Sequence, residues 1–308
     1  PAQPLAVFQP LIPPDWKMAL REGRFYAQVA FSAAAEQGFE AGGHGVVKGG
    51  SAWMPDNRLD GVDFVLPFRF SDSTWQLGTR GPVTLRIASV KNQVEAQNLT
   101  ADLQGWYPWS EQQPLILSNV NVDVLGGNIS IQQLRMPQHD AALLRVNNIS
   151  SSQLITAINP KQFTLSGRVN GALPLWLNDP DWIIRDGWLT NPGPMTLRLD
   201  KDMADALARD NMAAGAAINW LRYMEIARSW TRLNLTNLGV LTLRAELQGT
   251  SRLDGKSNTV RLNYQHQENL FTLWRSLRFG DNLQAWLEQH ASLPDSGCAA
   301  GDNCEEPQ

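Results

Sequence analysis

The chain has 308 residues, of which 43% are hydrophobic and only 18% are charged, and its formal net charge is −4. Such a chain does not favour nucleic acid or an anionic membrane surface as a partner, because both select clusters of Lys and Arg. The sequence holds no run of about 18 apolar residues, so this portion is not expected to span a bilayer. Amides take the place of charges, with 21 Asn and 21 Gln, and we expect them to keep the surface soluble.

The chain opens on a proline-rich stretch. Five prolines fall within residues 1–16, so we predict a linker or cap there without regular structure. The chain starts at Pro1 without an initiator Met or a secretory signal. We therefore expect it to be part of a longer protein.

Residues 17–199 show short stretches in which apolar and polar residues alternate. This period of two is typical of strands with one apolar face, and such strands pair in antiparallel sheets. The pattern is clearest from Leu115 to Leu177, where Gly126 and Gly127 mark a tight turn. The residues predicted to share the apolar face are Val120, Val122, Val124, Ile129, Ile131, Leu144, Val146, Phe163, Leu165 and Val169.

One stretch ends in an aromatic cluster, Trp106, Tyr107 and Trp109. Exposed aromatic rings can stack on sugars, and the 12 Trp of the chain make a carbohydrate-binding protein one alternative. More often such rings plug the end of a sheet or pack in a core, and we favour that interpretation.

Residues 200–230 carry apolar residues at helical spacing, including Met203, Leu207 and Ile218. This pattern predicts one helical insertion that packs against the sheet. Strands return over residues 231–279, and their predicted apolar face contains Leu241, Leu243, Leu247, Leu262 and Tyr264.

The end of the chain combines an apolar strand, a helix and a tail. The strand Leu270, Phe271, Thr272, Leu273, Trp274, Arg275, Ser276 and Leu277 is apolar on both sides. Its two apolar faces could be buried by a partner protein or by the short helix predicted at 280–293. The sequence does not decide between these two alternatives. Residues 294–308 are expected to be a disordered tail. Its Cys298 and Cys304 lie close enough for a disulfide but could equally be free thiols.

The predicted fold is mainly β: a long, twisted, mostly antiparallel sheet curled into an apolar groove, with one helical insertion and a short C-terminal helix. No catalytic constellation accompanies it. The four His lack metal-ligand spacing. Asp179 and Asp181 flank Pro180, an arrangement typical of turns rather than of catalysis. We therefore expect no enzyme activity, no metal site and no cofactor.

The stretches GGNISIQQLRMPQHDAALLRVNNISSSQLI, LSGRVNGALPLWL and WIIRDGWLTNPGPMTLRL together resemble the YdbH family of AsmA-like proteins from Gram-negative bacteria. The terminal LFTLWRSLRFGDNLQAWLEQ is similar to the C-terminal end of that family. The resemblance extends from about residue 85 to about residue 290. It consists of a pattern over many strands, without a short catalytic signature.

The resemblance implies a function that the composition alone does not. Members of the family are anchored in the inner membrane by an N-terminal helix and cross the periplasm. They carry phospholipids to the outer membrane along an apolar β-groove. The implied partners are phospholipids, a small YnbE-like outer-membrane lipoprotein bound by β-strand addition at the C-terminal end, and a periplasmic YdbL-like protein. The alternative is a non-conducting periplasmic scaffold whose apolar faces close into a core.

Overall fold

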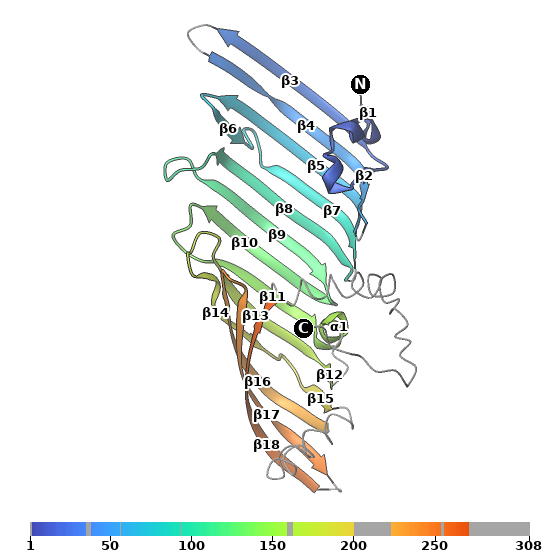
Figure 1. Cartoon of the computed structure of the whole chain (residues 1–308), viewed down its shortest axis with the longest axis vertical. Coiled ribbons are helices and arrows are strands. Elements are labelled where there is room, and N and C mark those ends of the chain that lie inside the picture. Colours follow the sequence, from blue (N-terminus) through green and yellow to red (C-terminus); the bar gives the residue numbers. More distant parts are fainter. Residues whose placement is uncertain are drawn as a thin grey trace, which may run out of the picture.

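The computed structural model describes residues 2–34, 38–55, 57–92, 94–158, 163–199, 223–253 and 256–270. Within these ranges eighteen strands join a single sheet (Figure 1). Every pairing between them is antiparallel. The prediction of a mainly β, antiparallel fold is therefore confirmed.

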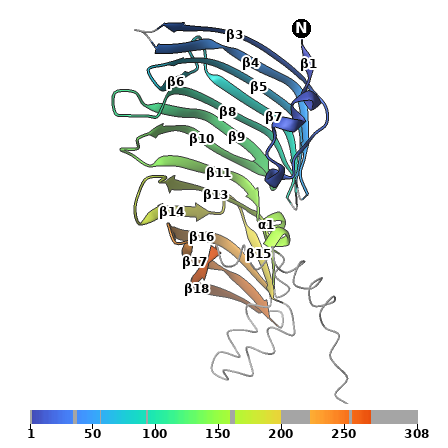
Figure 2. The same ribbon diagram turned by 45° about the horizontal axis from the view of Figure 1, so that its top comes forward.

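Most strands pair with their neighbours along the chain. In order they are β1 (Gln3–Pro4), β2 (Ala19–Leu20), β3 (Arg24–Ala34), β4 (Gly38–Trp53), β5 (Arg58–Ser71), β6 (Thr74–Leu77), β7 (Val83–Lys91), β8 (Ala96–Tyr107), β9 (Leu115–Val124), β10 (Gly127–Met136), β11 (Ala142–Ser150), β12 (Phe163–Ser166), β13 (Arg168–Leu175), β14 (Trp182–Thr190), β15 (Met195–Leu199), β16 (Tyr223–Thr236), β17 (Val240–Leu253) and β18 (Lys256–Asn269). The sheet twists and curls along its length, so that one of its faces is concave (Figure 2).

Three short helices lie along one long margin of the sheet: η1 (Leu5–Leu11), η2 (Pro14–Trp16) and α1 (Ser151–Ile158) (Figures 1 and 2). The Phe8 ring of η1 packs edge-on against Phe25 of β3, with centroids 4.6 Å apart. The absence of regular structure predicted for residues 1–16 is thus wrong. A short 3₁₀ helix makes few backbone hydrogen bonds, so it tolerates proline even at Pro10 within η1.

The predicted helical insertion 200–230 needs a correction at its C-terminal end. Residues 223–230 belong to β16, and residues 200–222 lie outside the described part. Met224 and Ile226 are buried while Tyr223 and Glu225 are exposed, which is the alternation of a strand. Met224 and Ile226 are two residues apart, and their pairing with β15 and β17 places them in the sheet.

Left-handed residues interrupt several strands and help to bend the sheet. Their positive φ angles are 52° at Asn98, 52° at Asn119, 55° at Asn148 and 57° at Asp186. Asn and Asp tolerate this conformation better than most residues, and the resulting bulges bend and twist a strand. Amide side chains from the next strand satisfy the freed backbone donors. The Asn148 N–H donates to Asn170 Oδ1 at 2.6 Å and the Asp186 N–H to Asn234 Oδ1 at 2.7 Å. Part of the amide surplus is therefore structural.

The face opposite the concave one is tied together by polar side chains around Asp102. The Arg86 guanidinium donates to Asp102 Oδ1 at 2.8 Å, and the Asn119 amide donates to Oδ2 at 2.9 Å. Burial alone would raise the pKa of Asp102, but the hydrogen bonds from Asn119 and Arg86 outweigh it and hold the pKa below its usual value. This carboxylate links β7, β8 and β9.

Asp102→Asn is expected to lower the free energy of unfolding by about 1–3 kcal/mol, because it weakens two hydrogen bonds to a buried charged group. The pKa of Asp102 is lowered on folding, so its ionised form stabilises the protein fully above the unfolded pKa of about 3.9. That contribution is lost as the pH falls through the lower pKa of the folded state. Urea unfolding at neutral and acidic pH measures both effects. Asp140→Asn, at an exposed position, serves as the control, and an equal loss there would contradict the assignment.

Candidate functional site

Cross-strand pairing places apolar residues side by side on the concave face, which we call the trough face. Four rows across the sheet define it: Phe25, Val47, Phe64, Leu85 and Ala101; Val83, Leu103, Leu117 and Leu134; Val122, Ile129, Val146, Gly171 and Leu189; and Leu175, Ile184, Leu235 and Leu241. Directly paired residues point to the same side of a sheet, so each row is continuous across its strands. The rows together extend from β3 to β17.

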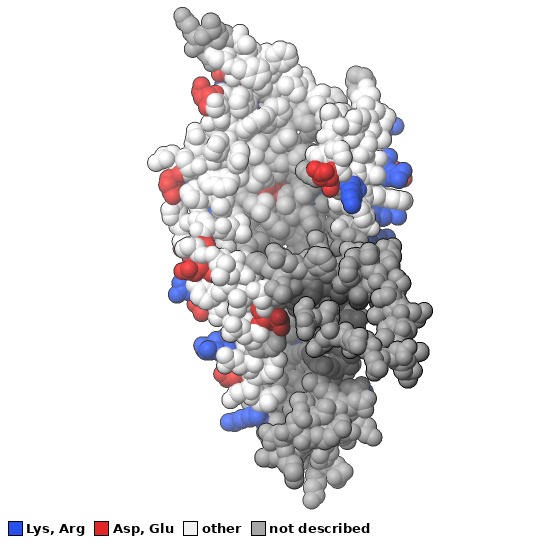
Figure 3. Space-filling model, viewed as in Figure 1, with Lys and Arg blue, Asp and Glu red and all other residues white. Residues whose placement is uncertain are grey.

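The trough face is uncharged over most of its length. From β3 to β15, among the residues that the structure describes, no Asp, Glu, Lys or Arg occupies it. In the space-filling view, most of the charged residues in sight lie at the margins of the hollow (Figure 3). The opposite face is polar, with pairs such as Asp63 with Arg86 and Thr100 with Asn121.

Burial along the trough face is uneven. Ile131, Leu134 and Ala142 form a buried cluster in the middle of the sheet, and Met195, Met224 and Ile226 form another near β16. Near the N-terminal end, Phe31 is exposed, at 77% of its possible surface. No second sheet covers this face within the described ranges. The trough face is thus a large apolar surface that is open at least at one end, and soluble proteins rarely leave such a surface without a function.

A comparison with protein families matches residues 1–292 to the YdbH-like family, described as "Intermembrane phospholipid transport protein YdbH". This chain belongs to the YdbH-like family. A curated relative, the "Probable phospholipid transport protein YdbH" of Escherichia coli strain K12, is 71% identical over 308 residues. The alignment covers 100% of this chain and 35% of the relative, so the chain spans about a third of that protein. No solved structure matches the chain.

The structure brings most of the predicted face residues of this YdbH-like chain together. Val120 pairs with Ile131, and Ile131 with Leu144, so these three share the trough face with the row of Val122. Val124 continues the alternation of β9. Leu165 and Val169 pack against the cluster around Met195. For Phe163 the structure gives the backbone pairing, with Leu199.

The C-terminal members lie on the same face. Leu243 pairs with Leu233 of β16, and Leu247 pairs with Leu262 of β18. Tyr264 pairs with Ala245 and is half-exposed. Polar residues also enter here, since Leu241 pairs with Glu268. At β18, the trough face of this YdbH-like chain therefore carries both apolar and charged residues.

The predicted partner edge strand falls almost entirely outside the described residues. Only Leu270 is described, and its N–H donates to the Gly239 carbonyl at 2.8 Å. Residues 271–277, the helix predicted at 280–293, and Cys298 and Cys304 all lie outside. Among described strands, β18 pairs only with β17.

Sequence reasoning left the N-terminal members of the trough face off the list of candidate residues. Phe25, Val47, Phe64 and Leu85 belong to it as fully as Val122 does. The period-two signal was present in their strands and could have found them. Within the described residues, no cluster of three His, Cys, Asp or Glu side chains could hold a metal ion. No described helix is long and apolar enough to cross a membrane.

Proposed function

We propose that this chain is a segment of a bridge that carries phospholipids between the inner and outer membranes, with acyl chains lying on the trough face. The observation that carries the proposal is the uncharged face from β3 to β15. It suits an acyl chain, which offers no group that could pair with a charge. The similarity to a relative named as a probable phospholipid transport protein supports the same activity.

The proposed mechanism is physical. Burying each CH₂ group contributes about 0.8 kcal/mol, so about 14 buried methylenes hold an acyl chain with roughly 11 kcal/mol. A lipid that leaves for water loses all of this free energy. A lipid that slides from one row of the trough face to the next keeps the same area buried. The barrier to sliding is therefore much lower than the barrier to release.

We further propose that the longer protein is anchored in the inner membrane and crosses the periplasm, and that its C-terminal end docks on a YnbE-like outer-membrane lipoprotein. The strand 270–277 would offer its backbone donors and acceptors to a strand of the lipoprotein. A periplasmic YdbL-like protein is proposed as an accessory. Cysteine pairs between residues 270–277 and the lipoprotein test the docking, and it is wrong if no register gives a crosslink.

A photocrosslinking amino acid at Val122 of the full-length protein is expected to capture ³²P-labelled phospholipid in cells. The same amino acid at Asn121 is the matched control, because Asn121 is adjacent in β9 but pairs with Thr100 on the opposite face. Strong labelling at Val122 and little at Asn121 would support the trough. Labelling at neither position in a folded protein would instead favour a non-conducting scaffold.

A further inference from the structure

The two long margins of the trough face differ in their side chains. One margin carries η1, η2 and α1 (Figure 2). The opposite margin is formed by the hairpin ends between β5 and β6, β8 and β9, and β10 and β11 (Figure 1). If lipids lie across the trough, their headgroups must reach water at one of these margins.

An aromatic row follows the hairpin margin, and we call Phe39, Phe70, Trp75, Tyr107 and Trp109 the aromatic rim. The ring centroids of Phe39 and Phe70 lie 6.1 Å apart, those of Phe70 and Trp75 4.9 Å, and those of Tyr107 and Trp109 5.7 Å. Trp75 and Tyr107 are directly paired across β6 and β8, which closes the remaining step. The rim is therefore continuous from β4 to the loop after β8.

The aromatic rim is exposed to solvent on one side and continuous with the apolar trough face on the other. Phe39, Trp75, Tyr107 and Trp109 are exposed by 52%, 42%, 52% and 40%. This exposure does not fit the plug or core that the sequence suggested for Tyr107 and Trp109. Phe70 pairs with Ala41 on the trough face, so the row extends that face to its edge. Trp and Tyr side chains favour the boundary between hydrocarbon and polar headgroups, because each has an apolar ring and a polar atom.

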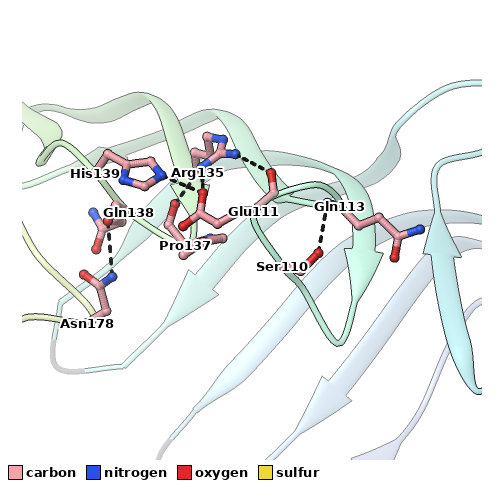
Figure 4. Close-up of polar contacts among 8 residues, drawn as sticks. All are labelled: Ser110, Glu111, Gln113, Arg135, Pro137, Gln138, His139 and Asn178. Atoms are coloured by element: carbon pink, nitrogen blue, oxygen red, sulfur yellow. Dashed lines mark hydrogen bonds and ion pairs between the residues drawn. The ribbon is translucent and has the colours of Figure 1, made fainter.

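Charges of both signs lie beside the rim, in the loop that carries Trp109 and the loop after β10. His139 Nε2 donates to Glu111 Oε2 at 2.7 Å, and Arg135 Nη2 donates to the Glu111 carbonyl at 3.1 Å (Figure 4). The side chains of His139 and Glu111 are exposed by 62% and 52%, so both can also meet a ligand. The Arg135 guanidinium and the Glu111 carboxylate, with Nη1 and Oε2 3.7 Å apart, complement a zwitterion, which carries a phosphate and an ammonium.

The opposite margin is built differently where the structure describes it. Trp53 pairs with Arg58 and so faces away from the trough, and the Arg21 and Arg58 guanidinium groups lie over its ring, at 5.1 and 4.8 Å from the centroid. Nearby, Phe8 of η1 covers the Phe25 ring of the trough face. At this margin, a lipid lying in the trough near β3 would therefore contact η1 and not open solvent.

We propose that phospholipid headgroups travel along the aromatic rim, with the acyl chains pointing from it across the trough face. This assignment rests on the proposed transport function and adds a direction to it. The glycerol and ester groups lie at the level of Trp75, Tyr107 and Trp109. The phosphate and ammonium lie beyond them, near Arg135 and Glu111.

The test compares three photocrosslinking positions in the full-length protein in cells: Val122 in the trough, Trp109 in the rim and Val90 near the opposite margin. Val90 faces the trough, because it pairs with Ala96 and Ala96 pairs with Val124. Lipids carry ³²P in the headgroup and ³H in the acyl chains. Mild alkaline hydrolysis of each adduct breaks the ester bonds. An adduct made through an acyl chain then keeps ³H and loses ³²P, whereas an adduct made through the headgroup or glycerol keeps ³²P and loses ³H.

We expect the Val122 adduct to keep ³H and the Trp109 adduct to keep ³²P. The ³²P retained at Trp109 should exceed that at Val90 about tenfold, which corresponds to about 1.4 kcal/mol. Equal retention at the two margins, more at Val90, or a Trp109 adduct that keeps only ³H would overturn the rim assignment while leaving transport intact. Absence of any adduct at Val122 would overturn the transport function itself, and the rim assignment with it.

Discussion

Val122→Asp is expected to slow phospholipid transport by the full-length protein about 100-fold while the chain remains folded. A charge at a site lined by hydrocarbon costs about 2.5–3.5 kcal/mol, and every 1.4 kcal/mol is a factor of ten. Val122 pairs with Ile129 in the uncharged row of the trough face, so each passing acyl chain would have to contact the carboxylate. The rate at which labelled phospholipid reaches the outer membrane, in cells that depend on this protein, measures the effect.

The control lies one residue away. Asn121→Asp puts the same charge on the same strand but on the polar face, where Asn121 pairs with Thr100 and Ser130. A second matched pair is Leu243→Asp on the trough face and Thr242→Asp on the other face. Transport that suffers as much from the Asn121 and Thr242 changes as from the Val122 and Leu243 changes would refute the trough.

Ile226→Ala is expected to lower the free energy of unfolding by about 2–5 kcal/mol, the usual cost of truncating a large buried side chain. Ile226 is 1% exposed and packs in the cluster with Met195 and Met224, where β15, β16 and β17 meet. Urea denaturation followed by circular dichroism gives the change. Val29→Ala is the comparison on the same face, because Val29 is 51% exposed and its removal opens no cavity. Similar losses for both variants would mean that the N-terminal part of the trough face is a packed core.

Strand alternation predicted most of the sheet because its signal is local and depends only on which side each residue faces. The row of Val122, Ile129 and Val146 could be read from period two and one turn signal at Gly126. The start of β16 was missed because the helix predicted from Met203, Leu207 and Ile218 was extended to residue 230. Met224 and Ile226 already follow the strand period, and pairing with β15 and β17 sets them in the sheet. The η1 helix was not predicted, because prolines disfavour both α-helices and strands. They do not exclude a short 3₁₀ helix.

The trough face was predictable where successive hairpins repeat the same alternation of residues. The aromatic rim was not, because it brings together residues that are far apart in the sequence. The predicted apolar residues of β9, β10 and β11 share one face because each hairpin sets its own register. The aromatic rim draws on residues from Phe39 to Trp109, and nothing in the sequence says that Trp75 stands beside Tyr107. The role of Asn148 and Asp186 in bending strands was also hidden, because a polar residue on the surface and one at a bulge look alike in a sequence.

If the trough face carries lipids as proposed, its antiparallel pairing makes the length of the path a matter of counting hairpins. Neighbouring strands lie about 4.8 Å apart, so each added hairpin lengthens the trough by about 10 Å. Because a hairpin returns the chain to the margin where it started, its insertion or deletion leaves the facing of all later strands unchanged. A protein built this way can be matched to envelopes of different width by duplicating or losing hairpins, with no new chemistry at any step.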